Sequence, residues 1–354
     1  MGRVGLATAL VLTALALFWW WVGRPQALPP SPLAAGERVA CVSYAPFERG
    51  QSPFTPGIVI PPAQIDRQLA ALARVTDCVR TYSTQEGLDQ VPPLARKHGL
   101  TVLLGVWIGR EAAANEIEIE SAIRIAKAHP DVIRAVIVGN EVLLRGEQRA
   151  ADLAAMIRRV EAAVPVPVTY ADVWEFWVKF PEIAPAVDFA TIHILPYWED
   201  EPVAIELAAA HVAAIRLRME TALSGKAIVI GETGWPSAGR QREGAVPSPV
   251  NQARFFHELL ALLKARGWDY NLIEAFDQDW KRALEGTVGG HWGFLDAEAR
   301  VKFAWGAPLS EHPHWPWQAG GGVLLALLGP AAGRGARGRD PAEGGPLALA
   351  AAPP

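Results

Sequence analysis

Residues 227–237, AIVIGETGWPS, carry the pattern that decides the fold: a short run of β-branched residues that ends in a glutamate. Residues 135–141, AVIVGNE, show the same pattern and close on Asn140 and Glu141. Short β-branched runs of this kind are typical of strands. We therefore expect two strands, each of which delivers one glutamate, Glu141 or Glu232, at its C-terminal end.

Six further runs of the same kind extend the pattern along the chain, at residues 39–44, 78–82, 101–107, 167–170, 189–195 and 271–276. Amphipathic stretches rich in Ala, Leu and Arg intervene, at residues 62–75, 117–128, 150–163, 203–223 and 251–265. This alternation predicts βα units around a parallel sheet. Eight units between residues 37 and 308 fit an α/β fold of the (β/α)8 TIM-barrel type, which typically takes about 250 residues. A doubly wound open sheet is the alternative, but residues 44–47, YAPF, are no glycine-rich phosphate loop.

The composition limits the kind of partner. Hydrophobic residues make up 51% of the 354 residues and charged residues 20%, which excludes a wholly disordered chain. A formal net charge of -4 leaves no basic surface for a nucleic-acid backbone, so we expect no nucleic-acid partner. The 14 tryptophans exceed the 5 tyrosines, and indole rings either fill a core or stack on sugar rings.

An N-terminal apolar run, residues 4–22 (VGLATALVLTALALFWWWV), carries no charge and is long enough to cross a bilayer as a helix, which needs about 20 residues. Trp19, Trp20 and Trp21 stand at one end of it, where interfacial aromatic residues belong. A signal peptide is the alternative, but its apolar stretch is usually about 7 to 15 residues long. We expect an uncleaved membrane anchor over residues 1–24 and a Pro/Ala-rich linker over residues 25–36.

The chain beyond the expected barrel domain of residues 37–308 has an unusual composition. Residues 320–328 are apolar and resemble the start of a second membrane segment, but they are too few to span a bilayer. Beyond Pro330 the composition is typical of a disordered tail. We expect residues 309–354 to hold a truncated membrane segment and a low-complexity tail.

The ends of the expected strands predict the active site, because barrel enzymes build their sites at the C-terminal ends of the strands. Glu141 and Glu232 would face one another there, and two facing carboxylates are the equipment for cleaving a glycosidic bond. Other residues at this rim are His193, Tyr197, Glu274, Phe276, Trp280 and Lys281. They form no cluster at metal-ligand spacing. The alternative is that the glutamates cap helices or pair with arginines and that the aromatic side chains pack at the rim.

Four motifs resemble glycoside hydrolase family 17, the β-1,3-glucanase family. They are Asn140-Glu141, residues 232–237 (ETGWPS), residues 274–278 (EAFDQ) with Trp280-Lys281, and Trp292-Gly293. The resemblance runs from about residue 39 to residue 305. It implies a retaining (β/α)8 enzyme with Glu141 as the acid/base and Glu232 as the nucleophile.

The resemblance also implies supporting roles. Asn140 would contact the sugar 2-hydroxyl, and Tyr197 would orient the nucleophile. Glu274 with Lys281 would support the proton donor and the nearby sugar. Tyr44 and Tyr82 would line the floor of the site, and Phe276, Trp280 and Trp235 would be sugar platforms. His193 is either a sugar contact or a buried, hydrogen-bonded histidine. The chemistry requires neither a metal nor an organic cofactor.

The layout with an N-terminal anchor is similar to that of membrane-anchored bacterial members linked to β-glucan assembly. That resemblance implies transfer of glucosyl units to a sugar, with β-1,6 linkages or branches as products, in the inner membrane with the barrel on the periplasmic side. Three alternatives stay open: a plain β-1,3-glucanase, a clan relative acting on another β-linked polysaccharide, and a non-catalytic tethered glucan-binding barrel.

Cys41 and Cys78 stand near the N-terminal ends of the first two expected strands, which are neighbours in a barrel. A disulfide between them is feasible in an oxidising compartment. Two buried free thiols are the alternative.

Overall fold

The computed structural model describes residues 2–336. The chain divides into two compact units. Residues 26–309 form the first, and residues 1–25 with the chain from Ser310 onward form the second.

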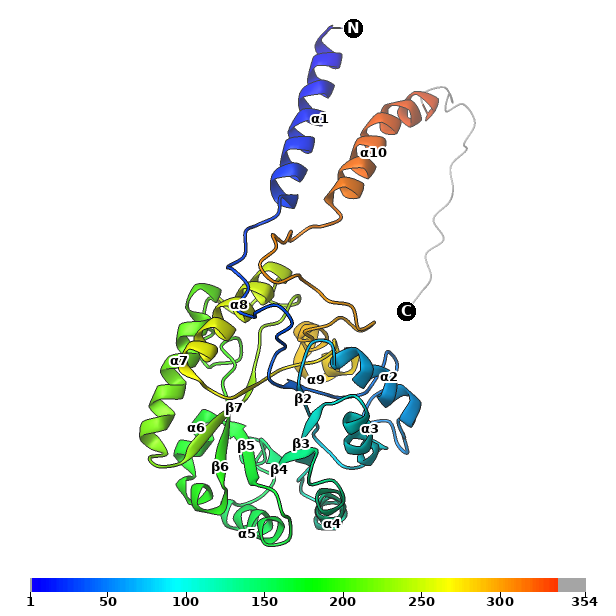
Figure 1. Ribbon diagram of the computed structural model, residues 1–354. Coiled ribbons are helices and arrows are strands. Elements are labelled where there is room, and N and C mark those ends of the chain that lie inside the picture. Colours follow the sequence, from blue (N-terminus) through cyan, green and yellow to red (C-terminus); the bar gives the residue numbers. More distant parts are fainter. Residues whose placement is uncertain (1, 337–354) are drawn as a thin grey trace, which may run out of the picture. The chain divides into compact units, whose positions relative to one another are not determined.

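The first unit is a closed barrel of eight parallel strands in the order β1 to β8 (Figure 1). The strands are β1 (Val42–Ser43), β2 (Cys78–Arg80), β3 (Thr101–Val106), β4 (Ile133–Asn140), β5 (Val168–Val173), β6 (Phe189–His193), β7 (Ala227–Thr233) and β8 (Tyr270–Leu272). This confirms the (β/α)8 fold. The first and last strands along the chain, β1 and β8, are shorter than expected. By contrast, β4 extends to Asn140, and β7 includes Glu232.

Helices surround the barrel: α2 (Pro62–Leu72), α3 (Val91–Lys97), α4 (Ala112–Ala128), α5 (Ala150–Glu161), α6 (Trp174–Lys179), α7 (Ile205–Ala222), α8 (Pro249–Arg266) and α9 (Arg282–Glu285). Short 3-10 turns η1 (Leu88–Gln90), η2 (Pro181–Ala186), η3 (Asp279–Lys281) and η4 (Gly286–His291) complete it. Leu153, Ile157 and Val160 show why α5 packs on the barrel, because their helical spacing puts all three buried side chains on one face. α3 and α6 were not expected, since both are too short to show a periodic pattern.

The segment before the barrel packs on it. The backbones of Gln26 and Leu309 exchange hydrogen bonds of 2.8 and 3.0 Å, and Leu28 and Leu33 pack against the core. The compact unit therefore begins at Gln26, where we expected a spacer as far as residue 36. The reason is that the two leucines of this Pro-rich stretch have apolar surface to bury.

The described residues of the second unit form two helices, α1 (Gly2–Gly23) and α10 (Trp315–Ala336). Within the described part of the chain, one helix, at Gly5–Gly23, is long and apolar enough to cross a membrane, a criterion that a signal sequence also meets. α10 holds the expected second segment as a helix but does not meet that criterion. Residues 331–336, expected in the tail, continue α10, and residues 337–354 lie outside the described residues.

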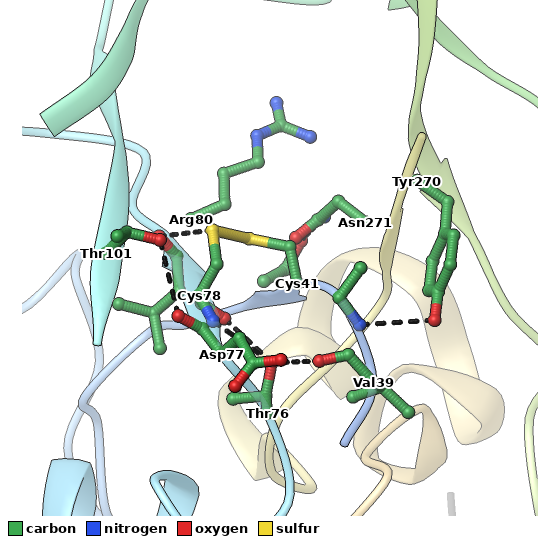
Figure 2. The surroundings of a disulfide bond; sticks show 12 residues. Val39, Cys41, Thr76, Asp77, Cys78, Arg80, Thr101, Tyr270 and Asn271 are labelled. Carbon is green, nitrogen blue, oxygen red and sulfur yellow. Dashed lines mark hydrogen bonds between the residues drawn. A yellow bond between two sulfur atoms is a disulfide. The ribbon is translucent and has the colours of Figure 1, made fainter. Parts of the chain in front are cut away.

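Cys41 and Cys78 form a disulfide inside the barrel, with their Cα atoms 4.3 Å apart (Figure 2). The two cysteines are therefore bonded and are not two buried free thiols. The sulfur atoms are buried with a small interior cluster of Leu103, Ala135, Ile137 and Ala171.

Candidate active site

The two glutamates lie together at the C-terminal ends of β4 and β7. One carboxylate oxygen of Glu141, one of Glu232 and a ring nitrogen of His193 all lie within 4.8 Å of one another. All three residues line a cavity of about 450 Å³ that also contains Trp198 and Trp292. A larger cavity of about 730 Å³ elsewhere on the barrel contains neither glutamate. The site expected from the strand ends is therefore assembled at one cavity.

Glu232 is the more buried carboxylate and accepts hydrogen bonds from two side chains. The Tyr82 hydroxyl donates to its Oε1 at 2.7 Å, and Arg80 donates to the same atom at 3.0 Å. Burial acts to raise the pKa of Glu232. The charges of His193, when protonated, and of Arg80 outweigh burial, with help from the Tyr82 hydrogen bond, so the pKa of Glu232 is lowered. Glu232 is thereby kept ionised, as a nucleophile must be.

Glu141 stands at a turn in the backbone. Its φ of 53° lies in the left-handed region, which costs a side-chain-bearing residue about 1 kcal/mol or more. Its amide donates to Ala171 O at 2.8 Å, which helps to hold this turn against β5. Gly139, with φ 90°, permits the turn, because a Cβ there would come 2.7 Å from the Val142 side chain. The turn leaves the Glu141 side chain partly exposed, at 24%, where a substrate can reach it.

His193 connects the two carboxylates. Its Nδ1 lies 2.9 Å from Glu141 Oε1, and its Nε2 lies 3.3 Å from an N–H of Arg80. When Nδ1 carries a proton it donates to Glu141, and Nε2 also lies 3.7 Å from Glu232 Oε1. His193 is fully buried, so it is a hydrogen-bonded histidine of the site floor, one of the two expected possibilities.

Arg80 is the main residue that the sequence analysis missed. It is 1% exposed and donates to Glu232 Oε1, to Gly231 O at 2.9 Å and to Asn140 Oδ1 at 2.5 Å. It thus joins β2 to the ends of β4 and β7. A signal was present, because an arginine inside a strand that is otherwise apolar must find a partner when it is buried.

Tyr197 does not have the position that the resemblance implied. Its hydroxyl donates to Arg240 O at 2.5 Å, and its ring contacts Trp198, Trp235 and Trp292. The hydroxyl that reaches Glu232 belongs instead to Tyr82, expected only to line the floor. The physical reason is that Tyr197, in the loop after β6, is buried among the indoles, whereas Tyr82 lies two residues beyond β2 and within hydrogen-bond reach of Glu232.

Glu274 and Lys281 form the expected pair, with Nζ 2.9 Å from Oε2 and both side chains buried. Burial raises the pKa of Glu274 to about 7, although Lys281 acts to lower it. Burial acts to lower the pKa of Lys281, but the carboxylates of Glu274 and Glu285 outweigh it and the pKa is raised. The charge of Lys281 also lowers the pKa of Glu232, so the pair acts on the expected nucleophile.

Several expected aromatic contacts are core residues instead. Tyr44 is fully buried and its hydroxyl donates to Gln68 at 2.7 Å, Trp235 is fully buried, and Phe276 is 5% exposed. Trp280 is half-buried against Phe47 and does not line the cavity with the two glutamates. These aromatic side chains bury their large apolar surface in the core of the barrel, which explains their positions.

The aromatic side chains that do line the cavity are Trp174, Phe176, Trp198 and Trp292. Trp198 is 38% exposed and stacks on buried Trp292, with ring centroids 6.2 Å apart. Glu285, at the end of α9, also lines the cavity, and burial raises its pKa. Trp174 and Phe176 were missed because β5 extends to Val173, beyond the expected end at residue 170, and Glu285 was missed because no strand-end pattern marks it.

Glu141, His193 and Glu232 are also the group that could hold a metal ion, on the geometry of residues 2–336. The guanidinium of Arg80, 3.0 Å from Glu232 and 3.3 Å from His193, opposes a cation at this place. The arrangement therefore suits a pair of carboxylates working by proton transfer and nucleophilic attack.

A model of the family described as "BtgE/BtgC glycoside hydrolase domain" matches residues 41–293, which include all eight strands and both glutamates. The chain belongs to this family. It therefore acts on glycosidic bonds, by hydrolysis or by transglycosylation. The expected place in glycoside hydrolase family 17 is confirmed by the relatives and solved structures that follow.

Two fungal relatives are similar to this chain over about two thirds or more of its length. The glucan 1,3-beta-glucosidase of Arthroderma benhamiae is 27% identical over 284 residues, 73% of this chain and 91% of that protein. The glucan 1,3-beta-glucosidase of Schizosaccharomyces pombe is 30% identical over 249 residues, 66% of this chain and 77% of that protein.

The solved structures agree. The glycoside hydrolase family 17 β-1,3-glucanosyltransferase from Rhizomucor miehei has a TM-score of 0.66 and 28% identity, covering 76% of this chain and 98% of that one. An active-site mutant of that enzyme holds laminaritriose. An endo-laminarinase from Formosa, 18% identical with a TM-score of 0.63, shares the fold.

Proposed function

We propose that this protein is a retaining β-1,3-glucan-active glucanosyltransferase with Glu141 as the acid/base and Glu232 as the nucleophile. The observation that carries the proposal is the approach of the two carboxylates to within 4.8 Å at the ends of β4 and β7. Retaining enzymes hold their carboxyl groups about 5 to 5.5 Å apart, while inverting enzymes leave about 6.5 to 9.5 Å for a water molecule. Retention of anomeric configuration is therefore expected.

In the first half-reaction, ionised Glu232 attacks the anomeric carbon as the glycosidic C–O bond breaks, and Glu141 gives its proton to the departing oxygen. In the second half-reaction, Glu141 takes a proton from the acceptor hydroxyl, whose oxygen replaces Glu232 at the anomeric carbon. Asn140 supports the sugar. Because its Oδ1 accepts from Arg80, its Nδ2 is the atom that can donate to the 2-hydroxyl.

The substrate is argued from the relatives and the cavity together. The relatives are named for β-1,3-glucan, and one solved neighbour holds laminaritriose. In this chain, exposed Trp198 beside Trp174 and Phe176 provides flat apolar faces on which glucose rings can stack. We infer that sugar units beyond the cleaved bond lie along these rings.

Transfer, with β-1,6 linkages or branches as products, is favoured over hydrolysis when a bound sugar hydroxyl outcompetes water. Trp198 is the ring placed to hold such an acceptor. We further propose that α1 anchors the protein in the bacterial inner membrane with the barrel on the periplasmic side. The Cys41–Cys78 disulfide supports an oxidising compartment.

The test is to incubate the full chain in detergent with laminari-oligosaccharides at millimolar concentration and follow product mass and linkage with time. Longer or newly linked products support transfer. If only shorter products appear, the protein is a plain β-1,3-glucanase. If, in a panel of β-linked polysaccharides, it acts only on a different glucan, that glucan is its substrate. Binding without turnover would leave a tethered glucan-binding barrel.

A further inference from the structure

The disulfide lies on the two strands that carry the partners of Glu232. Cys41 directly precedes β1 and Cys78 opens β2. Two residues further along these strands stand Ser43 and Arg80, which are paired with each other in the sheet register. Alternate residues of a strand face the same side, so all four side chains face the barrel interior. Figure 2 shows the Arg80 side chain extending away from the disulfide.

Both of these residues act on Glu232. Arg80 donates to its Oε1 directly at 3.0 Å. Ser43 acts through Tyr82, because Ser43 Oγ lies 2.8 Å from the Tyr82 hydroxyl, which lies 2.7 Å from Glu232. Tyr82 has one proton and gives it to the carboxylate, so the hydroxyl of Ser43 donates to Tyr82 and itself accepts from Asn271 at 2.7 Å.

Few residue pairs join β1 to its neighbouring strands in the sheet. β1 has two residues, and it pairs with β2 at Val42–Val79 and Ser43–Arg80 and with β8 at Val42–Leu272. By contrast, β5 and β6 pair continuously from Thr169 to Val173. The covalent bond thus joins β1 to β2, which share these two ladder positions and an isolated bridge between Val39 and Thr76.

A cavity lies beside Arg80, at the end of the barrel where the strands begin. This cavity of about 250 Å³ adjoins Cys41 and Arg80 and is lined in part by small residues, among them Ala135 and Gly231. Exposed Arg134, Ala227 and Asp269 also line it, so it is a surface cavity at the N-terminal ends of the strands. The disulfide is the rigid connection next to this volume.

We propose that the Cys41–Cys78 disulfide is a positioning element of the active site, which holds Arg80 and the Ser43–Tyr82 pair against Glu232. This rests on the proposed role of Glu232 as the nucleophile. Reduction by a dithiol consumes two electrons and two protons from the reductant, yields two thiols and leaves the reductant as a disulfide. It would let β1 and β2 separate and displace these partners, so the activity would depend on the redox state.

The test compares the full chain with Cys41→Val, which breaks the bond and keeps an apolar side chain of similar size, and with the Cys41→Ala/Cys78→Ala variant. We expect kcat on laminari-oligosaccharides to fall about tenfold or more with KM little changed, since a displacement near 1 Å can cost about a hundredfold in rate. We also expect the acidic limb of the pH–rate profile to move to higher pH, because Arg80 lies farther from Glu232.

The groups that face Glu232 and shape this limb are Arg80, Tyr82, Glu141, His193, Glu274, Lys281 and Glu285. All of these groups remain in the variants, so a shift of the acidic limb reports a change in their positions relative to Glu232. Ile157→Ala, in the buried face of α5, is the control for lost stability alone: it should lower Tm and leave the pH profile unchanged.

An unchanged kcat and acidic limb in folded Cys41→Val protein would overturn the proposal, even if Tm falls. Where the variants do not fold, wild-type protein treated with dithiothreitol below its Tm, with free thiols counted by mass spectrometry, gives the same comparison. The proposed function is tested separately by Glu232→Ala with the disulfide intact, because its failure would appear as retained turnover in that variant.

Discussion

Arg80 lies 3.0 Å from Glu232 in a salt bridge whose side chains are 1% and 6% exposed. The two residues come from β2 and β7, 152 positions apart in the chain. Two buried charges are tolerated because each compensates the other and because Tyr82 and Asn140 satisfy further hydrogen bonds. The pair sets both the place and the ionisation of the proposed nucleophile, and the first prediction follows from it.

Replacing Arg80 by Met should destabilise the fold by about 3 to 5 kcal/mol, because Glu232 is left as an uncompensated buried charge. Arg80→Lys keeps the charge but loses the fork that reaches Asn140 and Gly231, so it should fold and turn over slowly. Its pH–rate profile should show the acidic limb at higher pH. Denaturant unfolding and kcat across pH measure both effects, and a wild-type profile in Arg80→Lys would refute the role given to Arg80.

Tyr82→Phe should lower kcat about tenfold, since it removes the hydrogen bond to Glu232 and leaves the ring in place. Tyr197→Phe is the matched control, because its hydroxyl donates to the backbone of Arg240 and not to the carboxylate. Steady-state kinetics on laminari-oligosaccharides distinguish the two. Should Tyr197→Phe show the larger loss of kcat, the hydroxyl assignment made from this structure is wrong.

Glu141→Ala should lose activity on glucan but keep most of the first step on aryl β-glucosides whose leaving groups need no protonation. Glu232→Ala should be inactive on both, because no nucleophile remains. Release of the aryl group followed by absorbance measures the difference. Equal losses on both substrates in Glu141→Ala would argue against an acid/base at this position.

Glu232 should contribute to stability in a defined pH window. Its pKa in the folded state is lowered from the ordinary value of 4.5, so its contribution is present above about pH 4.5 and is lost as the pH falls through the folded value. The free energy of unfolding of wild type minus that of Glu232→Gln should therefore shrink on acidification below pH 4.5. Denaturant titrations from pH 3 to pH 7 measure this, and a difference that grows toward acid would contradict the lowered pKa.

Trp198→Ala should shift products from transfer toward hydrolysis with little loss of stability, because this ring is 38% exposed at the cavity. Trp235→Ala removes a fully buried indole, so it should cost about 3 to 5 kcal/mol of stability. The ratio of longer to shorter oligosaccharides and thermal unfolding are the two measurements. An unchanged product ratio in Trp198→Ala would place the acceptor elsewhere.

The barrel and the place of both glutamates could be predicted from the sequence because their signals are local. A β-branched run that ends in Asn140-Glu141 or in Gly231-Glu232 predicts both a strand and the position of its C-terminal end from about ten residues. Parallel strands in a closed barrel bring all such ends to one face, so the two glutamates can be placed together without knowing the distances between the strands. The same rule brought Glu274 and Lys281 to the site.

The remaining parts of the site depend on barrel closure. Local sequence was enough to predict the fold, the family and the two carboxylates that share a face, since each of these rests on residues that are neighbours in the chain. Only the tertiary structure decided that Arg80 and Tyr82 hold Glu232, that Tyr197 and Trp235 pack in the core, and that Cys41 bonds to Cys78. Partners of this kind lie far apart along the chain, and which of them meet depends on strand register and side-chain direction, two properties that no local pattern encodes.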